Sequence, residues 1–472
     1  MPQDQRHGDE LKPALPFPAE TVFAALTAQL GERASRAAAV LTAHGASESY
    51  HVAHAPDIVV FPQSTEEVVA VVKTCAAHAA PVVPYGAGTS LEGNASAVRG
   101  GVCIDFAQMN RLVALHAEDL DCRVQPGITR KRLNAELRDT GLFFPIDPGA
   151  DASIGGMAST RGSGTMAVRY GTMRDNVLAL EVVLADGRVI RTSRRARKSA
   201  AGYDLTRLFV GAEGTLGVLT EITLRLHPVP EAISAVVCPF ESFEGAVDTA
   251  IAVSQAGIPV ARIELLDEIM IRGVNQYAKL GIMEQPTLFF EFHGTPGAVA
   301  EQADSVSEIA HEHGALGFEV ATRTEDRNRL WTARDNTLYA GTGLRPGSKA
   351  VITDVCVPVS RLAECLIATK RDIAQSGLMA PIVGHVGDGN FHVSVLLDMD
   401  DPAEVATGKA FSERLVERAL AMEGTCTGEH GVGQGKMKYL KAEHGEALAA
   451  MRAIKHALDP QDLMNPGKIV AF

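Results

Sequence analysis

The sequence lacks paired cysteines and long apolar runs. Its seven cysteines are scattered through 472 residues without a Cys-x-x-Cys pair, which excludes a disulfide framework and an iron–sulfur or zinc-ribbon module. No run is apolar for long enough to span a bilayer, and the first ten residues contain no apolar stretch of the kind found in secretory signals. We therefore expect a cytoplasmic protein without a transmembrane segment.

Positive charge is also in short supply. Lys and Arg number 44 against 57 Asp and Glu, a net charge of -13, which argues against binding along a phosphate backbone, so no nucleic-acid partner is expected. One basic stretch, residues 191–198, could touch the inner face of a membrane or an acidic redox partner, but a charge run this short is more often a solvated loop. We assign it no function.

One histidine motif is the most informative feature that is present. In His385-Val-Gly-Asp-Gly-Asn-Phe-His392, the central Gly-Asp-Gly-Asn is a turn signature. A chain reversal there would carry the two histidines back toward one another on adjoining extended segments. Neutral imidazole suits Zn and related divalent ions, so both histidines are candidate metal ligands. The alternative is a glycine-rich turn flanked by two structural histidines.

A second motif, Gly428-Glu-His-Gly431, changes the balance between these two interpretations. It offers a carboxylate, Glu429, to complete a metal site, and a spare imidazole, His430, as a general base. An open position on such an ion would polarise a substrate oxygen. The two motifs together indicate metal-assisted chemistry.

The chain length and a hydrophobic content of 46% predict two or three domains. Residues 1–50 are alanine-rich and read as a helical segment, and a mixed α+β domain follows over residues 51–230, ending at a Pro-Val-Pro sequence. In residues 231–472, helical patterns at 242–256, 297–314 and 358–376 alternate with strand patterns at 287–292, 350–355 and 392–397. This alternation favours an antiparallel sheet covered by helices.

Two glycine-rich stretches lie in the first of these domains. Pro84-Tyr-Gly-Ala-Gly-Thr-Ser90 fails the dinucleotide-binding fingerprint G-x-G-x-x-G, because Leu91 stands where the third glycine would be. Residues 147–171 contain a second supply of unhindered amides and hydroxyls. Together they could hold a large anionic cofactor.

These stretches, with residues 170–176 and 213–218, resemble the FAD domain of the vanillyl-alcohol-oxidase flavoprotein superfamily. Residues 384–392, 428–431 and 458–468 resemble its D-2-hydroxyacid dehydrogenase branch, most closely the D-lactate dehydrogenases that do not use NAD. The resemblance covers nearly everything after residue 51. It implies an α+β fold with a two-subdomain FAD-binding domain, an α+β substrate domain with an antiparallel sheet, and a terminal segment that packs back toward the flavin.

The resemblance also implies roles for individual residues. The pyrophosphate of FAD would be bound by Gly86, Gly88, Thr89 and Ser90, beside Pro84, and other parts of FAD would be lined by Pro148, Gly149, Ser159, Gly164, Gly214 and Val218. Some members of the superfamily hold FAD covalently through a histidine in the phosphate loop. This loop has Tyr85 and no histidine, so we expect noncovalent FAD.

The implied reaction is oxidation of a D-2-hydroxyacid, most simply D-lactate, to the 2-oxoacid, with hydride passing to FAD and then to a quinone or cytochrome. Zn or Mn held by His385, His392 and Glu429 would lower the pKa of the hydroxyl, and His430 would take its proton. Arg334 matches the carboxylate-binding arginine of the family and has suitable fork geometry. An exposed ion pair is the alternative for this arginine, and Lys349 is a second candidate for the carboxylate.

Several alternatives stay open at this point. The substrate could be glycolate or D-2-hydroxyglutarate, and the chain could be a subunit of a glycolate-oxidising complex. In a different class, it could be a flavin-binding transferase or an electron-transfer subunit, although the metal motif speaks against that. The oligomeric state, with a homodimer as one option, and the physiological acceptor have no readable signal.

Overall fold

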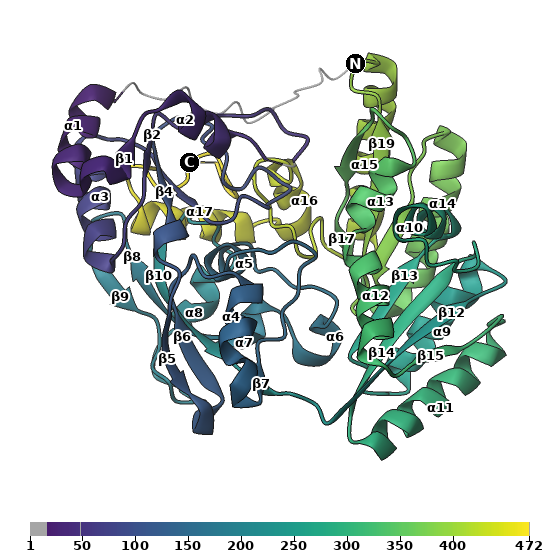
Figure 1. Cartoon of the computed structure of the whole chain (residues 1–472). Helices are drawn as coiled ribbons and strands as arrows, with labels where there is room; N and C mark the ends of the chain where they lie inside the picture. Colours follow the sequence, from purple (N-terminus) through teal and green to yellow (C-terminus); the bar gives the residue numbers. More distant parts are fainter. Residues whose placement is uncertain (1–16, 48, 472) are drawn as a thin grey trace.

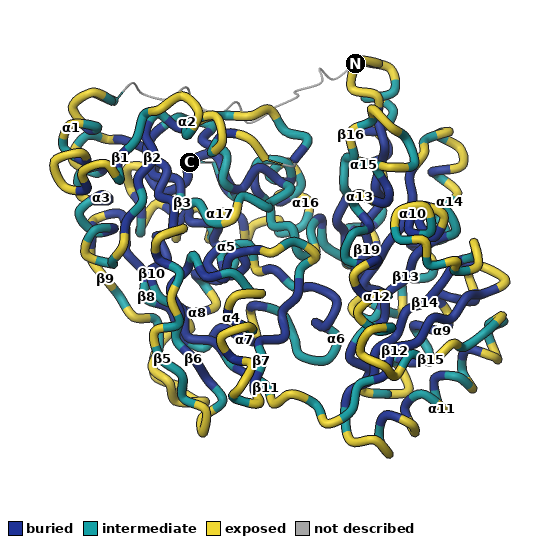
Figure 2. Tube along the Cα trace, viewed as in Figure 1, coloured by how far each residue is buried: buried dark blue, intermediate teal, exposed yellow. Residues whose placement is uncertain are grey.

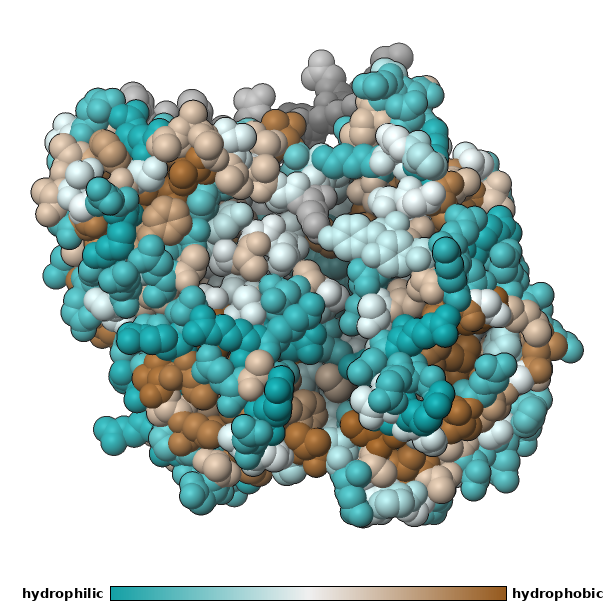
Figure 3. Space-filling model, in the orientation of Figure 1, coloured by the Kyte–Doolittle hydropathy of each residue, from teal (hydrophilic) through white to brown (hydrophobic). Residues whose placement is uncertain are grey.

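The computed structural model describes residues 17–47 and 49–471. Figure 1 shows two lobes side by side, the first built mainly from the N-terminal half of the chain and the second from the C-terminal half. On the face drawn in Figure 3, hydrophilic side chains cover most of both lobes and apolar ones lie in small groups. Within the described residues, no helix combines the length and the apolarity that crossing a membrane requires.

The first lobe contains a four-stranded sheet with parallel strands at its centre. Its order is β1 (Ala34–Ser35), β2 (Ile58–Val60), β4 (Val102–Asp105), β3 (Val82–Tyr85), and only β1 runs antiparallel. Helices α1 (Ala19–Leu30) and α3 (Thr65–Ala77) share a core with this sheet, and α2 (Ala38–Gly45) lies beside them. Residues 17–47 are therefore packed into the first lobe, and the rest of the predicted helical segment, residues 1–16, lies outside the described residues.

Helix α3 follows its sequence signals, with one difference. Ser64 caps it by accepting the N–H of Glu67, and its apolar positions Val68, Val71, Val72 and Cys75 are buried. The Glu67 carboxylate does not return to the N–H of Ser64, as a full capping box requires. It accepts the N–H of Gln63 at 2.7 Å and pairs with Arg33 instead. The sequence Ser64-Thr-Glu-Glu67 has a capping-box pattern, but only half of the box forms, because a nearby arginine competes for the Glu67 carboxylate.

A second, antiparallel sheet completes the first lobe. Its order is β5 (Leu112–His116), β6 (Asp121–Val124), β10 (Val218–Arg225), β8 (Val177–Val183), β9 (Val189–Arg191). Asp186-Gly187, a dipeptide typical of hairpin turns, joins β8 to β9, with Gly187 at φ 79°. Shorter elements surround it: α4 (Arg130–Leu137), β7 (Leu142–Phe143), α5 (Ile154–Thr160), α6 (Ala167–Tyr170), α7 (Met173–Asn176), α8 (Leu205–Phe209) and β11 (His227–Pro228).

The second lobe is built on an eight-stranded antiparallel sheet. Its path is β15 (Glu319–Ala321), β12 (Ala232–Pro239), β14 (Thr287–Gly294), β13 (Arg262–Leu266), β18 (Ile382–His385), β19 (Asn390–Leu397), β16 (Lys349–Ile352), and β17 (Val355–Cys356) also pairs with β19. Each face has its own core, since Val236 and Phe290 belong to one apolar cluster whereas Val237 and Phe289 belong to another. Figure 2 shows strands of this sheet buried between the covering helices.

Helices cover both faces of this sheet. One face carries α9 (Phe243–Gln255), α11 (Pro296–Glu312), α14 (Leu362–Ser376) and α15 (Pro402–Ala421), and the other carries α10 (Glu268–Ala278), α12 (Thr324–Asp335) and α13 (Thr337–Gly343). The second face is the one that turns toward the first lobe at its β18–β19 end.

The chain finally returns to the first lobe. After α16 (Leu440–His444) and α17 (Ala447–Leu458), Met464 forms a parallel bridge with Val82 on β3, and Asn465 donates its backbone N–H to the carbonyl of Val82 at 2.8 Å. The last described residues thereby extend the four-stranded sheet beyond its edge strand. Buried Lys455 reinforces this return by donating to the carbonyl oxygens of Thr215 and Met464.

The predicted α+β class, with an antiparallel sheet in the second lobe, is confirmed. The predicted strand at 350–355 is wrong in one respect, because β16 ends at Ile352 and β17 starts at Val355. Thr353 and Asp354 between them are both buried, and their side chains bond other segments rather than continuing the strand. The domain boundaries at residues 50 and 230 stay predictions.

Candidate active site

A cavity of about 610 Å³ lies where the two lobes and the returning C-terminal segment meet. The first lobe supplies its glycine-rich walls, and β16, β18, β19, α12 and α13 of the second lobe supply the opposite wall. Most of the residues predicted to bind FAD line it, namely Pro84, Gly86, Gly88, Thr89, Ser90, Pro148, Gly149, Ser159 and Gly214. Gly164 and Val218 do not line it, and Val218 is fully buried in the sheet core.

Glycine is required where the two glycine-rich stretches meet. A Cβ atom on Gly86 would lie 2.1 Å from the hydroxyl oxygen of Ser153, and Gly88 has φ +71°. A side chain at Gly86 would push the two stretches apart, and one at Gly88 would be strained and would collide with Tyr85 of the same loop. Asn94 and Asn465 also line the cavity, and within the described part of the chain their Oδ1 atoms are buried without a hydrogen-bond partner. An open, glycine-walled cavity with unused polar atoms fits a ligand as large as FAD.

The predicted hairpin brings the two histidines of the first motif together. β18 and β19 pair with His385 opposite Asn390 and Val383 opposite His392, and the two imidazole centroids are 5.4 Å apart. Gly389 in the turn has φ +79°, and a Cβ there would lie 2.1 Å from the carbonyl oxygen of Val357. The turn prediction is confirmed, and it places both imidazoles at the cavity.

Glu429 joins the two histidines to form a compact triad. One of its carboxylate oxygens lies 3.1 Å from Nε2 of His385 and 3.2 Å from Nε2 of His392. Ligand atoms about 2.0–2.1 Å from a tetrahedral Zn²⁺ are about 3.3 Å apart, so this spacing fits a divalent ion with little movement. The structure thus brings together the three side chains predicted as metal ligands.

Both histidines are oriented through their other ring nitrogen. Nδ1 of His385 faces the carboxylate of buried Glu264 at 2.7 Å, and Nδ1 of His392 faces the carbonyl oxygen of Thr353 at 3.1 Å. These acceptors favour a proton on Nδ1 and leave Nε2 to point at Glu429. Such outer contacts are typical of histidines that bind metals.

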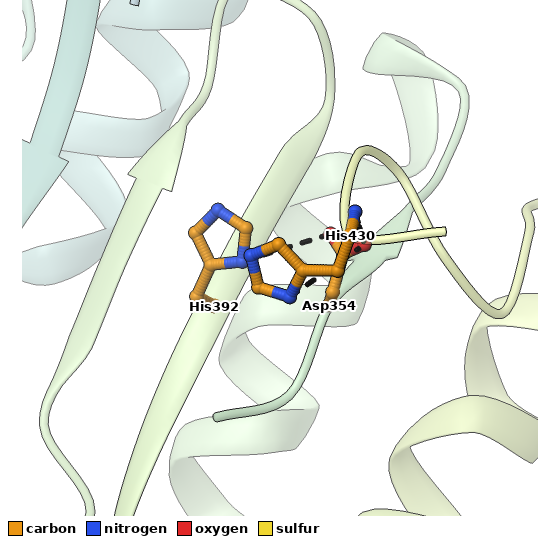
Figure 4. A group of neighbouring side chains, drawn as sticks. All are labelled: Asp354, His392 and His430. Atoms are coloured by element: carbon orange, nitrogen blue, oxygen red, sulfur yellow. Dashed lines mark hydrogen bonds and ion pairs between the residues drawn. The ribbon is translucent and has the colours of Figure 1, made fainter. Parts of the chain in front are cut away.

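A second group of potential ligands overlaps the first. Asp354, His392 and His430 also lie close together, and Figure 4 shows both imidazoles beside the Asp354 carboxylate. The ring of His430 stacks on that of His392 with a centroid distance of 4.9 Å and an interplanar angle of 11°. Nδ1 of His392 is 3.6 Å from Asp354 and closer to the carbonyl of Thr353. We therefore favour the triad with Glu429 as the ion-binding set.

Burial and charge act in opposite directions on these groups. Burial lowers the pKa of His385, but Glu264 and Glu429 raise it by more, and the net pKa lies well above the usual value. Burial raises the pKa of Glu429, and His385 then lowers it well below the usual value. For His430, burial lowers the pKa, with Asp354 acting in the opposite direction. An uncharged His430 at neutral pH is the state that can accept a proton.

Arg334 is a buried side chain rather than an exposed one. Only 6% of it is exposed, it lines the cavity, and its Nε donates to Glu264 at 2.7 Å. The exposed ion pair considered from the sequence is therefore excluded. Lys349 lies exposed at the start of β16 and does not line the cavity.

Three polar residues of the site were missed in the sequence. Asp354 accepts the backbone N–H groups of Glu429 and His430 at 2.9 and 3.0 Å, Glu264 bonds His385, and Ser163 donates to Glu429 at 2.6 Å. Glu264 and Asp354 interrupt apolar stretches, at Ile263-Glu264-Leu265 and Ile352-Thr-Asp-Val355, and an acid in a buried strand is a usable signal. Ser163 gave no signal that distinguishes it from its neighbours.

The chain matches known families over both lobes. Residues 56–193 match the model described as FAD binding domain, and residues 229–469 match the model described as FAD linked oxidases, C-terminal domain. Among solved structures, p-cresol methylhydroxylase has a TM-score of 0.81 at 20% identity, covering 96% of both chains. Alkyldihydroxyacetonephosphate synthase has a TM-score of 0.76 at 20% identity, covering 99% of this chain and 88% of that one. At these identities the likeness concerns the fold.

Curated relatives are much closer in sequence. The probable mitochondrial D-lactate dehydrogenase of Danio rerio is 53% identical over 93% of this chain and 89% of that protein. The mitochondrial D-lactate dehydrogenase [cytochrome] of Arabidopsis thaliana is 51% identical over 90% of this chain and 76% of that protein. The glycolate oxidase subunit GlcD of Bacillus subtilis (strain 168) is 35% identical over 88% of this chain and 89% of that protein.

Proposed function

This chain belongs to the FAD-linked oxidases, and we propose that it oxidises a D-2-hydroxyacid, most simply D-lactate, to the corresponding 2-oxoacid. The observation that carries the proposal is the convergence of His385, His392 and Glu429 in the same cavity as the glycine-rich FAD segments. When bound, FAD supplies a hydride acceptor and a divalent ion supplies a Lewis acid at the hydroxyl oxygen.

The side chains of the site have distinct tasks in this reaction. His430 accepts the hydroxyl proton on Nε2, since its Nδ1 is buried 4.0 Å from the Asp354 carboxylate. Arg334 keeps Glu264 in place through Nε and Nη2, and its remaining guanidinium N–H groups bind the substrate carboxylate. Glu264 in turn fixes the ring of His385 so that Nε2 faces Glu429. Two electrons and one proton leave C2 together as hydride, and the hydroxyl proton leaves separately.

The second-lobe wall favours a small monocarboxylic acid. Its side chains beside the triad include Val383, opposite His392, and Ile352, opposite Ser394. Of the described residues that line the cavity, Arg334 is the only lysine or arginine from this lobe, and the other is Lys131 on α4. A second carboxylate, as in D-2-hydroxyglutarate, would be costly to bury without another cation. An apolar wall suits the methyl group of lactate, which glycolate lacks.

For the electron acceptor we propose a cytochrome, because relatives such as that of Arabidopsis thaliana carry this word in their names. A quinone is the alternative. The proposed metal is Zn or Mn, and a donor set of two imidazoles and one carboxylate does not distinguish between them. A cytoplasmic location, contact with a membrane surface and a homodimer stay predictions.

The direct test is anaerobic mixing of the FAD-loaded protein with a panel of D- and L-2-hydroxyacids while the flavin spectrum is recorded. We expect D-lactate to bleach the flavin, L-lactate to leave it oxidised, and glycolate and D-2-hydroxyglutarate to react more slowly. Faster bleaching by glycolate would favour the glycolate-oxidising alternative. No bleaching with any D-2-hydroxyacid would contradict the proposal and favour a flavin-binding transferase or electron-transfer role.

Replacement of Arg334 with lysine should weaken substrate binding before it affects FAD. An ammonium group cannot make the two parallel hydrogen bonds of a guanidinium to a carboxylate, and we expect KM for D-lactate to rise about 10- to 100-fold. FAD content should match the wild-type protein. Lys349→Gln is the matched control, because this cation lies outside the cavity and its loss should leave KM unchanged. A raised KM in the control and not in Arg334→Lys would assign the carboxylate to Lys349.

A further inference from the structure

The loop that carries Glu429 and His430 is held by two buried carboxylates, one from each lobe. The second lobe supplies Asp354, which is fully buried between β16 and β17. Its Oδ2 accepts the backbone N–H of Glu429 at 2.9 Å and that of His430 at 3.0 Å. It also accepts the hydroxyl of Thr427 at 2.7 Å, so the start of the loop is fixed to the large sheet.

The first lobe supplies Glu213, which lies between α8 and β10. It accepts the backbone N–H of Val432 at 2.6 Å and that of Gly433 at 2.9 Å. It also accepts the side-chain amide of Asn94 at 2.8 Å, and the same amide donates to the carbonyl oxygen of His430 at 3.3 Å. The end of the loop is therefore fixed to the FAD-binding lobe.

Close approach between this loop and the first lobe depends on two glycines. Gly431 has φ +79°, and a Cβ there would lie 2.7 Å from the Glu213 carboxylate. Gly433 has φ +49°, and a Cβ there would lie 2.0 Å from the carbonyl oxygen of Glu92. A side chain at either position would move the loop away from Glu213 and Glu92 of the first lobe.

The ring of His430 has little else to hold it. Within the described part of the chain, its Nδ1 is buried without a hydrogen-bond partner and lies 4.0 Å from the Asp354 carboxylate, and the ring stacks on that of His392. Its backbone N–H is bound by Asp354 and its backbone carbonyl by Asn94. The position of this imidazole therefore depends on its backbone, which is hydrogen-bonded to Asp354 of the second lobe and to Asn94 of the first lobe.

From these contacts we propose that Glu213, acting with Asn94, is a positioning residue that fixes His430 against the FAD site for the hydride-transfer reaction. This inference rests on the proposed function, because it assumes that His430 takes the substrate proton. It goes further in stating that the first lobe places the base, in addition to holding FAD. Glu213 itself touches no reacting atom in this assignment.

Glu213 lines the cavity, and burial raises its pKa to about 7 despite the hydrogen bonds it accepts from Val432, Asn94 and Gly433. A raised pKa in a cavity is also typical of a general base. Its geometry argues against that role. Three N–H donors make four contacts with its two oxygens, which occupy the acceptor capacity of a carboxylate. We therefore assign the Glu213 carboxylate the role of hydrogen-bond acceptor for the loop rather than that of general base.

The test compares Glu213→Ala and Glu213→Gln with the wild-type holoenzyme by two measurements. Hydrogen–deuterium exchange of the segment 427–434 reports on the loop directly and needs no turnover. Anaerobic stopped-flow reduction of the flavin by D-lactate reports on the placement of the base. FAD content is measured in every sample.

In Glu213→Ala we expect the amides of Val432 and Gly433 to exchange about tenfold or more faster, because both backbone N–H groups lose their side-chain acceptor. Flavin reduction should slow about 100-fold, the usual effect of a misplacement of about 1 Å, while KM changes less than about threefold. Glu213→Gln keeps one oxygen acceptor and should recover most of the amide protection, with a rate within about tenfold of the wild-type protein.

The matched control is Asp267→Asn, which also removes a buried carboxylate but caps α10 in the second lobe, away from the loop. It should leave both loop exchange and reduction rate unchanged. If Glu213→Ala does not fold, Asn94→Ala leaves the Glu213 carboxylate in place, removes the side-chain bonds to Glu213 and to the His430 carbonyl, and should slow reduction in the same direction.

Unchanged exchange at Val432 and Gly433 in Glu213→Ala would overturn the inference. So would faster exchange with flavin reduction within about threefold of the wild-type rate, because the loop position would then not matter. If the wild-type flavin is reduced by no hydroxyacid, the proposed function fails, whereas the exchange result still decides whether Glu213 holds the loop.

Discussion

In the His385→Ala variant, D-lactate is expected to reduce the bound flavin about 10³-fold or more slowly than in the wild-type protein. The variant loses one of three ion-binding side chains, and the polarisation that a divalent ion supplies to a hydroxyl oxygen is worth several kcal/mol. It also leaves the buried Glu264 carboxylate without its imidazole partner. FAD content should stay at the wild-type level, because His385 belongs to the second-lobe wall of the cavity.

Metal analysis and a control variant make this experiment decisive. The metal content of His385→Ala should fall, and chelation of the wild-type protein should reproduce its loss of activity, with recovery on addition of Zn or Mn. His293→Gln is the control, since His293 is also a buried histidine paired with a carboxylate, Glu291, on the same sheet. It does not line the cavity and should reduce flavin at the wild-type rate. Full activity of the metal-free wild-type protein would refute the metal-assisted mechanism.

Replacement of His430 with glutamine should slow flavin reduction about 10²- to 10⁴-fold with little change in KM, which is the usual contribution of a general base. The pH dependence gives a more specific test. Burial lowers the pKa of His430, and a divalent ion beside it would lower that pKa further. The imidazole is therefore neutral at neutral pH and becomes protonated only as the pH falls below its lowered pKa.

The wild-type reduction rate should consequently be constant around neutral pH and decline on the acid side, below the ordinary histidine pKa of about 6.5. His430→Gln should lack this decline, because its side chain does not titrate. Stopped-flow reduction measured across the pH range in both proteins checks this expectation. An acid-side decline that persists unchanged in the variant would assign the base to another group.

The hairpin and its two histidines could be predicted because the information is local. A Gly-Asp-Gly-Asn turn between two extended segments fixes which side chains face one another, and the β18–β19 register follows from it. Helix α3, the β8–β9 turn and strand β10 have local signals of the same kind in the sequence. In each, a cap, a turn residue or an alternating pattern lies within a few positions of the element that it specifies.

Other elements had weaker signals. β12, β13 and β18 lie inside a sheet covered on both faces, where apolar residues run on without alternation and a strand resembles a piece of buried helix. α15 was missed although its start carries a clear signal, an Asp401 cap followed by Pro402. The Asp401 cap and Pro402 are sufficient to predict the start of this helix from the sequence.

The contacts between lobes could not be derived from local patterns. Glu429 meets Ser163, and Glu213 meets Val432, across more than 200 positions of sequence. The hydrophobic periodicity of a segment indicates its own secondary structure, and it does not indicate which loops of the two lobes are in contact. For the same reason Arg334 could be placed at the site by resemblance, while its bond to Glu264 came only from the structure.

The strand-like pairing of Met464 with Val82 has a consequence for the order of events during synthesis. Asn465 also reaches the carbonyl of Asn94, across 371 positions of the chain. The ribosome therefore releases the phosphate loop long before the residues that complete the sheet behind it exist. The first lobe can therefore make its last contacts only after the segment around Met464 has been translated. We therefore expect FAD to bind in its mature geometry only after this segment is in place, since Asn465 lines the cavity.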